Sequence, residues 1–179
     1  MASALMGALR EALVALPLTH GDIYRRHQLV WRAMHGLVRD GRSFIFASVS
    51  DHMVAVRSEQ LERGEPSSLT DGWLRVQVVA ARRDGQRMMA IESRQMEGWA
   101  TALLIPHGLS VRRVEVLGDL VASGCKRDPA TGKDLTIRLP VKDMLLDVAI
   151  DHRAKANLAW ANGVGRGKRF GFGMLRRAN

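Results

Sequence analysis

The sequence predicts an α+β fold made of two successive units, each with its strands and helices in the order βαββαβ. Two features of the hydrophobic residues lead to this prediction: they alternate with polar residues in some segments and recur at helical spacing in others. A chain of 179 residues with 46% hydrophobic content can bury a packed core. In such a fold the helices cover one face of each antiparallel sheet, which leaves a face or a cleft for a ligand.

The first half of the chain contains an amphipathic helix followed by a hairpin. The helix is predicted to begin after its N-cap Asp22 and to end before Gly41, with an apolar face and a basic stripe opposite. Residues 43–50 and 52–59 are rich in β-branched and aromatic residues, and their close spacing predicts two paired strands. The basic stripe of the helix consists of Arg25, Arg32 and Arg39.

A polar stretch at residues 63–72 separates the two halves. We therefore expect a first domain over residues 1–64, a linker over residues 65–72 and a second domain over residues 73–179. Within the second domain the patterns predict strands at 73–83, 111–122, 134–150 and 173–177, a short apolar segment at 88–93, helices at 94–105 and 153–161, and a basic loop at 124–133.

The composition favours a polyanionic partner. The formal net charge is +9, and each phosphate that a Lys or Arg neutralises releases a counterion, so nucleic acid is the first candidate. The single cysteine, Cys125, excludes an intramolecular disulfide framework and a thiolate-rich metal site, and it fits a reducing, cytoplasmic setting. Arg10 and Glu11 interrupt the apolar N-terminus, so neither a signal peptide nor a membrane span is predicted.

The segment GVGRGKRFGFG, residues 163–173, is the most distinctive feature of the chain. Glycines permit positive φ and close approach, so their amides can face phosphate oxygens while basic neighbours add charge. A P-loop is excluded because Arg169 follows Lys168 where Ser or Thr is required. A dinucleotide-binding turn is excluded because the segment lies close to the C-terminus. A glycine loop that serves packing alone is the structural alternative.

Two motifs together resemble a known family. GVGRGKRFGFGML, residues 163–175, resembles the C-terminal glycine-rich motif of the CRISPR repeat-processing endoribonucleases. YRRHQLVW, residues 24–31, resembles the first-helix signature of their CasE-like branch, which serves Cascade-type surveillance complexes. A related processing enzyme from a type IV system would have similar sequence motifs. The two motifs lie at opposite ends of the chain in the family's order, which makes their joint occurrence more specific than either alone.

The resemblance implies two tandem ferredoxin-like (RRM-like) βαββαβ domains with a C-terminal glycine-rich loop. It also implies that the chain binds the hairpin of a CRISPR RNA repeat and cleaves it on the 3′ side of the stem. The partners would then be this RNA and the other subunits of a multi-protein CRISPR effector complex, with no membrane involved.

The resemblance further implies candidate site residues. Tyr24 and His27 match the active-site pair of the family, and Lys168 in the glycine loop is the third catalytic candidate. The candidate RNA-binding residues are Gly163, Gly165, Arg166, Gly167, Arg169, Gly171 and Gly173 in the glycine loop and, by position alone, Lys126, Arg127 and Lys133 in the basic loop.

These residue types suit RNA cleavage without a metal. The ribose 2′-OH must lose a proton, attack the phosphorus in line and expel the 5′-oxygen, which leaves a 2′,3′-cyclic phosphate and a 5′-hydroxyl. His27 can act as the base or, when charged, stabilise the phosphate, as Lys168 can. Tyr24 can orient the nucleophile or share the proton transfer. The remaining histidines show no metal-ligand spacing, so no metal and no cofactor are predicted.

Two alternatives remain open. A noncatalytic RNA-hairpin-binding subunit of the same fold would use the basic surface while His27 only packs, and it would not cut RNA. A basic scaffold subunit would contact proteins through apolar surface and bind unrelated hairpins equally at matched ionic strength, because phosphate contacts alone do not read sequence.

Overall fold

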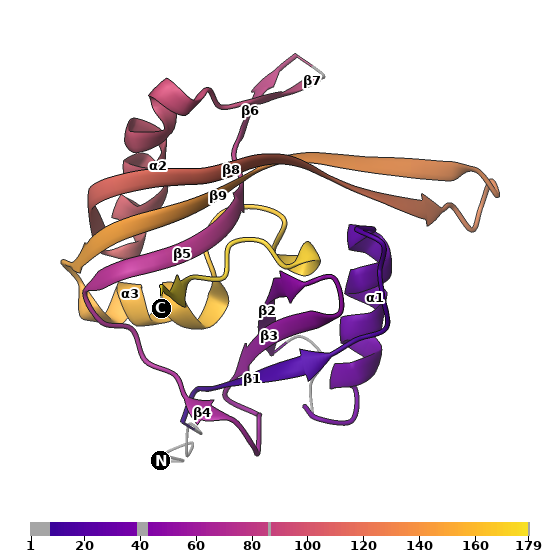
Figure 1. Cartoon of the computed structure of the whole chain (residues 1–179), viewed down its shortest axis with the longest axis horizontal. Coiled ribbons are helices and arrows are strands. Elements are labelled where there is room, and N and C mark those ends of the chain that lie inside the picture. Colours follow the sequence, from indigo (N-terminus) through magenta and orange to yellow (C-terminus); the bar gives the residue numbers. More distant parts are fainter. Residues whose placement is uncertain (1–7, 39–42, 86, 179) are drawn as a thin grey trace.

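The protein is described by a computed structural model that covers residues 8–38, 43–85 and 87–178 (Figure 1). Two four-stranded antiparallel sheets form its framework, and they lie one after the other along the chain. A separate two-stranded hairpin extends from the second sheet.

The first sheet has the strand order β2-β3-β1-β4. Strand β3 lies between β1 and β2 and is antiparallel to both, so β1 and β2 run parallel with α1 as the connection between them. This order and pairing are those of a ferredoxin-like unit, although residues 59–64, between β3 and β4, form no helix. Its elements are β1 (Arg10–Ala15), α1 (Ile23–Met34), β2 (Phe44–Ser50), β3 (Met53–Ser58) and β4 (Glu65–Pro66). The short strand β4 lies within the stretch expected as a linker, and the division of the chain into domains stays a prediction.

The second sheet repeats the arrangement with the order β10-β5-β9-β8. Its two helices, α2 and α3, pack over one face, and their apolar residues form one core with the sheet. The elements are β5 (Gly72–Val79), β6 (Ala81–Asp84), β7 (Arg87–Ala90), η1 (Ser93–Gln95), α2 (Met96–Leu104), η2 (Ile105–His107), β8 (Leu109–Arg127), β9 (Asp134–Ile150), α3 (Arg153–Asn162), η3 (Lys168–Phe170) and β10 (Arg176–Arg177). The predicted α+β fold of two ferredoxin-like units is therefore confirmed.

Helix α1 begins where the sequence predicts and ends earlier. The Asp22 side chain caps its first turn, but the last helical residue is Met34, and Gly41 lies outside the described residues. Gly36 explains the early end, because glycine costs about 1 kcal/mol relative to alanine inside a helix. The chain then turns so that Val38 is buried in the core of the first unit.

Strand β8 (Leu109–Arg127) is longer than the predicted 111–122, whereas β9 (Asp134–Ile150) has the predicted bounds. Strand β5 ends at Val79, opposite Val141 of β9. The pairing of β8 with β9 continues beyond the end of β5, as far as Arg127 and Asp134. Residues 121–140, called the arm below, project past α1 as a two-stranded ribbon (Figure 1). The loop expected at residues 124–133 is correspondingly shorter, because residues 124–127 belong to β8.

A buried arginine joins the two units. The side chain of Arg57, on β3, is fully buried and donates hydrogen bonds to the backbone carbonyl oxygens of Trp160 (2.7 Å) and Leu175 (2.9 Å) in the second unit. It also donates to the carboxylate of Glu11 (2.7 Å), and its guanidinium stacks on the Trp160 ring, 3.6 Å from the centroid. These contacts fix how the first sheet sits against α3 and β10.

Candidate active site

The imidazole of His27 faces the glycine-rich loop from α1. Its Nδ1 lies 2.6 Å from the backbone carbonyl oxygen of Arg169. Because a carbonyl oxygen only accepts, Nδ1 must carry the hydrogen of this bond. The neutral form of His27 then has its free lone pair on Nε2, which is the nitrogen able to take a proton from a substrate.

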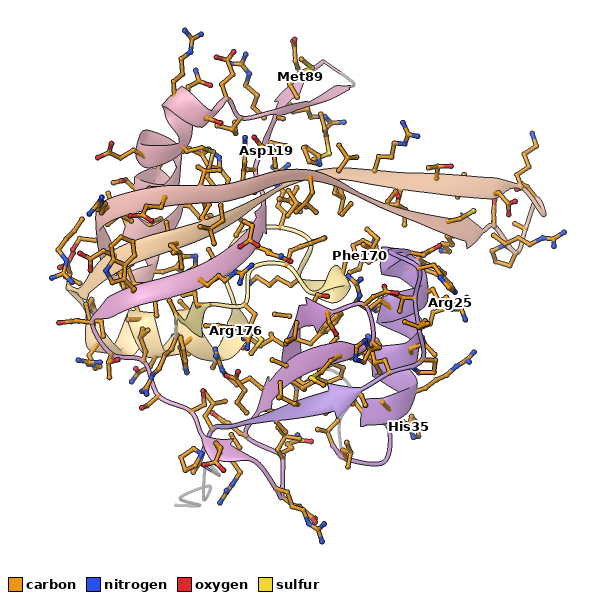
Figure 2. All side chains as sticks on the ribbon, viewed as in Figure 1. Arg25, His35, Met89, Asp119, Phe170 and Arg176 are labelled. Atoms are coloured by element: carbon orange, nitrogen blue, oxygen red, sulfur yellow. The ribbon has the colours of Figure 1, made fainter. Side chains whose placement is uncertain are left out.

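Three aromatic side chains surround the His27 ring. The ring centroids of Trp31 and Phe170 lie 5.8 Å and 5.9 Å away, both in edge-to-face geometry, and that of Tyr24 lies 6.3 Å away. Figure 2 shows Phe170 lying next to α1, the helix that also carries Arg25. His27 is therefore half-buried at the seam between the first unit and the glycine loop.

Burial lowers the pKa of His27 below its ordinary value. The hydrogen bond to the Arg169 carbonyl opposes this effect because it favours the protonated ring, and the positive charge of Arg169 adds to the lowering. The lowered pKa keeps the imidazole neutral at physiological pH, which is the state that a general base requires.

The path of the glycine loop depends on backbone conformations that residues other than glycine rarely adopt. A Cβ on Gly171, whose φ is +88°, would lie 2.6 Å from the Phe46 ring, and one on Gly173 would overlap the carbonyl oxygen of Val164. The loop glycines at positive φ are Gly163, Gly165, Gly167, Gly171 and Gly173. This path carries the Arg169 carbonyl to His27.

Several loop amides are already bonded inside the protein. Those of Gly163, Gly171 and Gly173 donate to backbone carbonyl oxygens, and all three residues are buried. The exposed residues of the loop are Gly165, Arg166, Lys168 and Arg169. The groups that the loop exposes to solvent are therefore mostly cationic side chains rather than glycine amides.

Lys168 and Arg169 act on different neighbours. The charge of Lys168 helps to lower the pKa of His107, in η2, whereas no hydrogen bond or ion pair joins Lys168 to His27 within the described part of the chain. The Arg169 guanidinium stacks on Phe170, 4.6 Å from the ring centroid, and its charge acts on His27. Of these two cations, Arg169 is the one whose charge acts on His27, while its backbone carbonyl makes the direct contact with the ring.

A groove of about 460 Å³ lies between α1 and the arm. It contains Tyr24 and Arg127 from the predicted site, together with two arginines that sequence analysis placed only on the outer stripe of the helix, Arg25 and Arg32. Their spacing of seven residues, two helical turns, could have identified them as neighbours on one face. The lining residues are Tyr24, Arg25, Gln28, Leu29, Arg32, Cys125 and Arg127.

The other basic candidates lie toward the tip of the arm. Lys126 and Lys133 are exposed on either side of a turn that the Asp128 carboxylate organises by accepting from Ala130 N (3.0 Å) and Thr131 Oγ1 (2.7 Å). In the described ranges no three His, Cys, Asp or Glu side chains cluster as they would around a metal ion. None of the helices described is both long and apolar enough to cross a membrane.

No family model and no curated protein matches the sequence. Comparison with solved structures nevertheless identifies the fold as that of the CRISPR endoribonucleases. Thermus thermophilus Cse3 bound to an RNA representing a pre-cleavage complex superposes with a TM-score of 0.69 at 15% identity, covering 96% of this chain and 100% of that chain. Cas6e from Escherichia coli str. K-12 superposes with a TM-score of 0.53 at 14% identity, covering 95% and 99%. A chain of a CRISPR RNA-guided surveillance complex gives a TM-score of 0.58 at 18% identity over 92% and 95%.

Proposed function

We propose that the protein is a metal-independent endoribonuclease that binds the hairpin of a CRISPR RNA repeat and cleaves it 3′ of the stem. The observation that carries the proposal is the orientation of His27, whose Nδ1 donates to the Arg169 carbonyl and whose Nε2 is left as a base. The cationic groove beside Tyr24 and the fold shared with Cse3, itself solved with a pre-cleavage RNA, support it.

In the proposed reaction Nε2 of His27 removes the proton of the ribose 2′-OH. The resulting alkoxide attacks the adjacent phosphorus, the bond to the 5′-oxygen breaks, and a proton from the Tyr24 hydroxyl or from water completes the leaving hydroxyl. The products are a 2′,3′-cyclic phosphate and a 5′-hydroxyl. Arg169 stabilises the charge that grows on the phosphate, and Lys168 does so if the RNA spans the loop.

Arginines lining the groove and lysines on the arm would hold the RNA through its phosphates. Arg25, Arg32 and Arg127 face one groove from two elements, and Lys126 and Lys133 continue the positive charge along the arm. After cleavage the protein would stay on the hairpin and join a multi-subunit effector, since a similar chain belongs to a CRISPR RNA-guided surveillance complex.

The test is cleavage of the source organism's own CRISPR repeat RNA in excess EDTA. Wild type is compared with His27→Ala, and normal RNA with RNA that carries a 2′-deoxy sugar at the cut. We expect one cut with a cyclic phosphate end, lost in both controls. Tight hairpin-specific binding without a cut would instead identify a noncatalytic RNA-binding subunit, and equal binding to unrelated hairpins would identify a basic scaffold.

A further inference from the structure

The carboxylate of Asp22 connects the proposed catalytic helix to the arm. Its Oδ1 accepts from the amides of Tyr24 (2.8 Å) and Arg25 (2.9 Å) and so caps α1. Its Oδ2 accepts from the amide of Cys125 (3.2 Å) in the arm, and its backbone forms an isolated parallel bridge with Ser123. One side chain therefore sets the first turn of the helix and holds the arm beside it.

Gly124 makes this approach possible. A Cβ at this position would lie 2.8 Å from the amide nitrogen of Tyr24 and 2.9 Å from Asp22 Oδ1, closer than side chains come to such atoms. Gly124 is absent from the residues with positive φ, so its backbone conformation suits any residue. The glycine is required at this point because of contact distance alone.

An apolar cluster lies beside the contact and keeps the arm in place independently. Ile23 of α1 packs with Ala122 and Ile137 of the arm and with Phe170 of the glycine loop. Variants that remove the Asp22 contact should therefore still fold. The hydrogen bonds at Asp22 and the close approach at Gly124 instead determine the fine position of the arm relative to Tyr24.

We propose that Asp22 and Gly124 are positioning residues, which hold the arm against the first turn of α1 so that RNA bound to the arm places its scissile phosphate at Tyr24 and His27. This inference rests on the proposed ribonuclease function. The arm and the helix both line the groove, so a displacement of one relative to the other moves bound phosphate away from the base. A misplacement of about 1 Å can cost roughly 100-fold in rate.

Three variants separate this role from helix capping and from general stability. In Asp22→Ser the single hydroxyl still caps the helix, since serine is as good a cap as aspartate, but it cannot accept from Cys125 at the same time. In Gly124→Ala the added methyl group forces the arm away from Tyr24. Gly118→Ala is the matched control, because Gly118 lies in the same strand with nothing within 4 Å of the added Cβ.

The first measurement is hydrogen exchange of the Cys125 amide in the free protein. Loss of its bond to Asp22 should speed exchange roughly tenfold in Asp22→Ser and Gly124→Ala and leave Gly118→Ala unchanged. Unchanged exchange in the first two variants would overturn the proposal, whether or not the protein cuts RNA.

The second measurement is single-turnover cleavage of the repeat hairpin together with its Kd. We expect about a 100-fold slower cut in Asp22→Ser and Gly124→Ala, with Kd within about threefold of wild type. An unchanged cleavage rate, or a Kd weakened by the same factor as the rate, would overturn the positioning role. A wild-type protein that cuts no repeat RNA would refute the proposed function and this role with it, while the exchange result would still decide whether Asp22 holds the arm.

Discussion

Nδ1 of His27 donates a hydrogen bond to the carbonyl oxygen of Arg169, 2.6 Å away, between residues 142 positions apart in the chain. The bond fixes which ring nitrogen carries the hydrogen, and it fixes the orientation of the ring relative to the glycine loop. A side chain from the first helix and a backbone atom from the C-terminal loop thus act as one unit, because the ring is oriented only when both parts of the chain are in place.

The first prediction concerns this histidine. His27→Ala should slow single-turnover cleavage by about 10²- to 10⁴-fold, the usual contribution of a general base, and leave the Kd for the hairpin within about threefold. His35→Ala, at the exposed C-terminal end of the same helix, is the matched control and should cut at the wild-type rate. Equal rates for wild type and His27→Ala would show that His27 only packs.

The pH dependence follows from the lowered pKa of His27. Burial, with a contribution from the charge of Arg169, outweighs the opposing hydrogen bond to the carbonyl, so the ring protonates only below its ordinary value of about 6.5. A base must be neutral, so the cleavage rate should stay level as pH falls to about 6.5 and decrease only below the lowered pKa. A charged stabiliser would give the opposite profile, with a rate that rises as pH falls.

The same group makes a contribution to stability with a defined sign. Between the two pKa values the unfolded chain binds a proton at His27 and the folded chain does not. This contribution is fully present above the unfolded pKa of about 6.5 and is lost as pH falls through the folded pKa. The difference in unfolding free energy between wild type and His27→Ala should therefore shrink in acid, as urea titrations at several pH values would detect.

Gly171 provides the third prediction, because its substitution combines backbone strain with a clash. Gly171→Ala places a methyl group 2.6 Å from the Phe46 ring at a φ of +88° and should destabilise the fold by about 2 to 4 kcal/mol. Gly132→Ala has similar strain, with a φ of +69°, but meets nothing within 4 Å. It should cost about 1 kcal/mol, and equal losses in urea unfolding for both variants would contradict a packed role for the loop.

Much of this architecture can be predicted from local sequence patterns. The cap at Asp22 has a direct signature, and the β-branched and aromatic residues of two closely spaced segments, 43–50 and 52–59, identify the hairpin of β2 and β3. Glycines at five alternating or nearby loop positions do adopt the positive φ that their pattern suggests. In each case the determining interaction lies within a few residues of the chain.

The rest depends on contacts between distant segments, which leave no local pattern. The residues Gly-Cys-Lys-Arg at 124–127 have the composition of a loop, yet they extend β8 because β9 continues beside them. The partner of His27 is a backbone carbonyl, which any residue at position 169 would supply. Lys168 acts on His107 because the loop packs against α2 and β5, so no spacing in the sequence could reveal this neighbour.

The buried arginine gives the fourth prediction. Arg57→Met should destabilise the protein by about 3 to 5 kcal/mol, because it removes the Arg57 donor of two carbonyl oxygens and the shortest ion pair of the Glu11 carboxylate. Arg113→Met is the control, since Arg113 is exposed and its ion pair with Glu115 spans 3.5 Å, so it should cost no more than about 1 kcal/mol. Chemical denaturation of both variants measures the difference, and similar losses would mean that Arg57 does not join the two units.

The fifth prediction tests the groove through its salt dependence. Each phosphate contact to a single strand contributes about 0.7 to the slope of log Kd against log salt. Replacing Arg25, Arg32 or Arg127 by alanine should lower the slope by about that amount and weaken binding of unrelated RNAs to a similar degree, because phosphate contacts carry no sequence information. Arg94→Ala, an exposed residue beside α2 and outside the groove, should leave the slope unchanged. If the groove variants lose affinity for the repeat hairpin alone, the three arginines contact bases instead of phosphates, and an unchanged slope with unchanged affinity would place the RNA elsewhere on the protein.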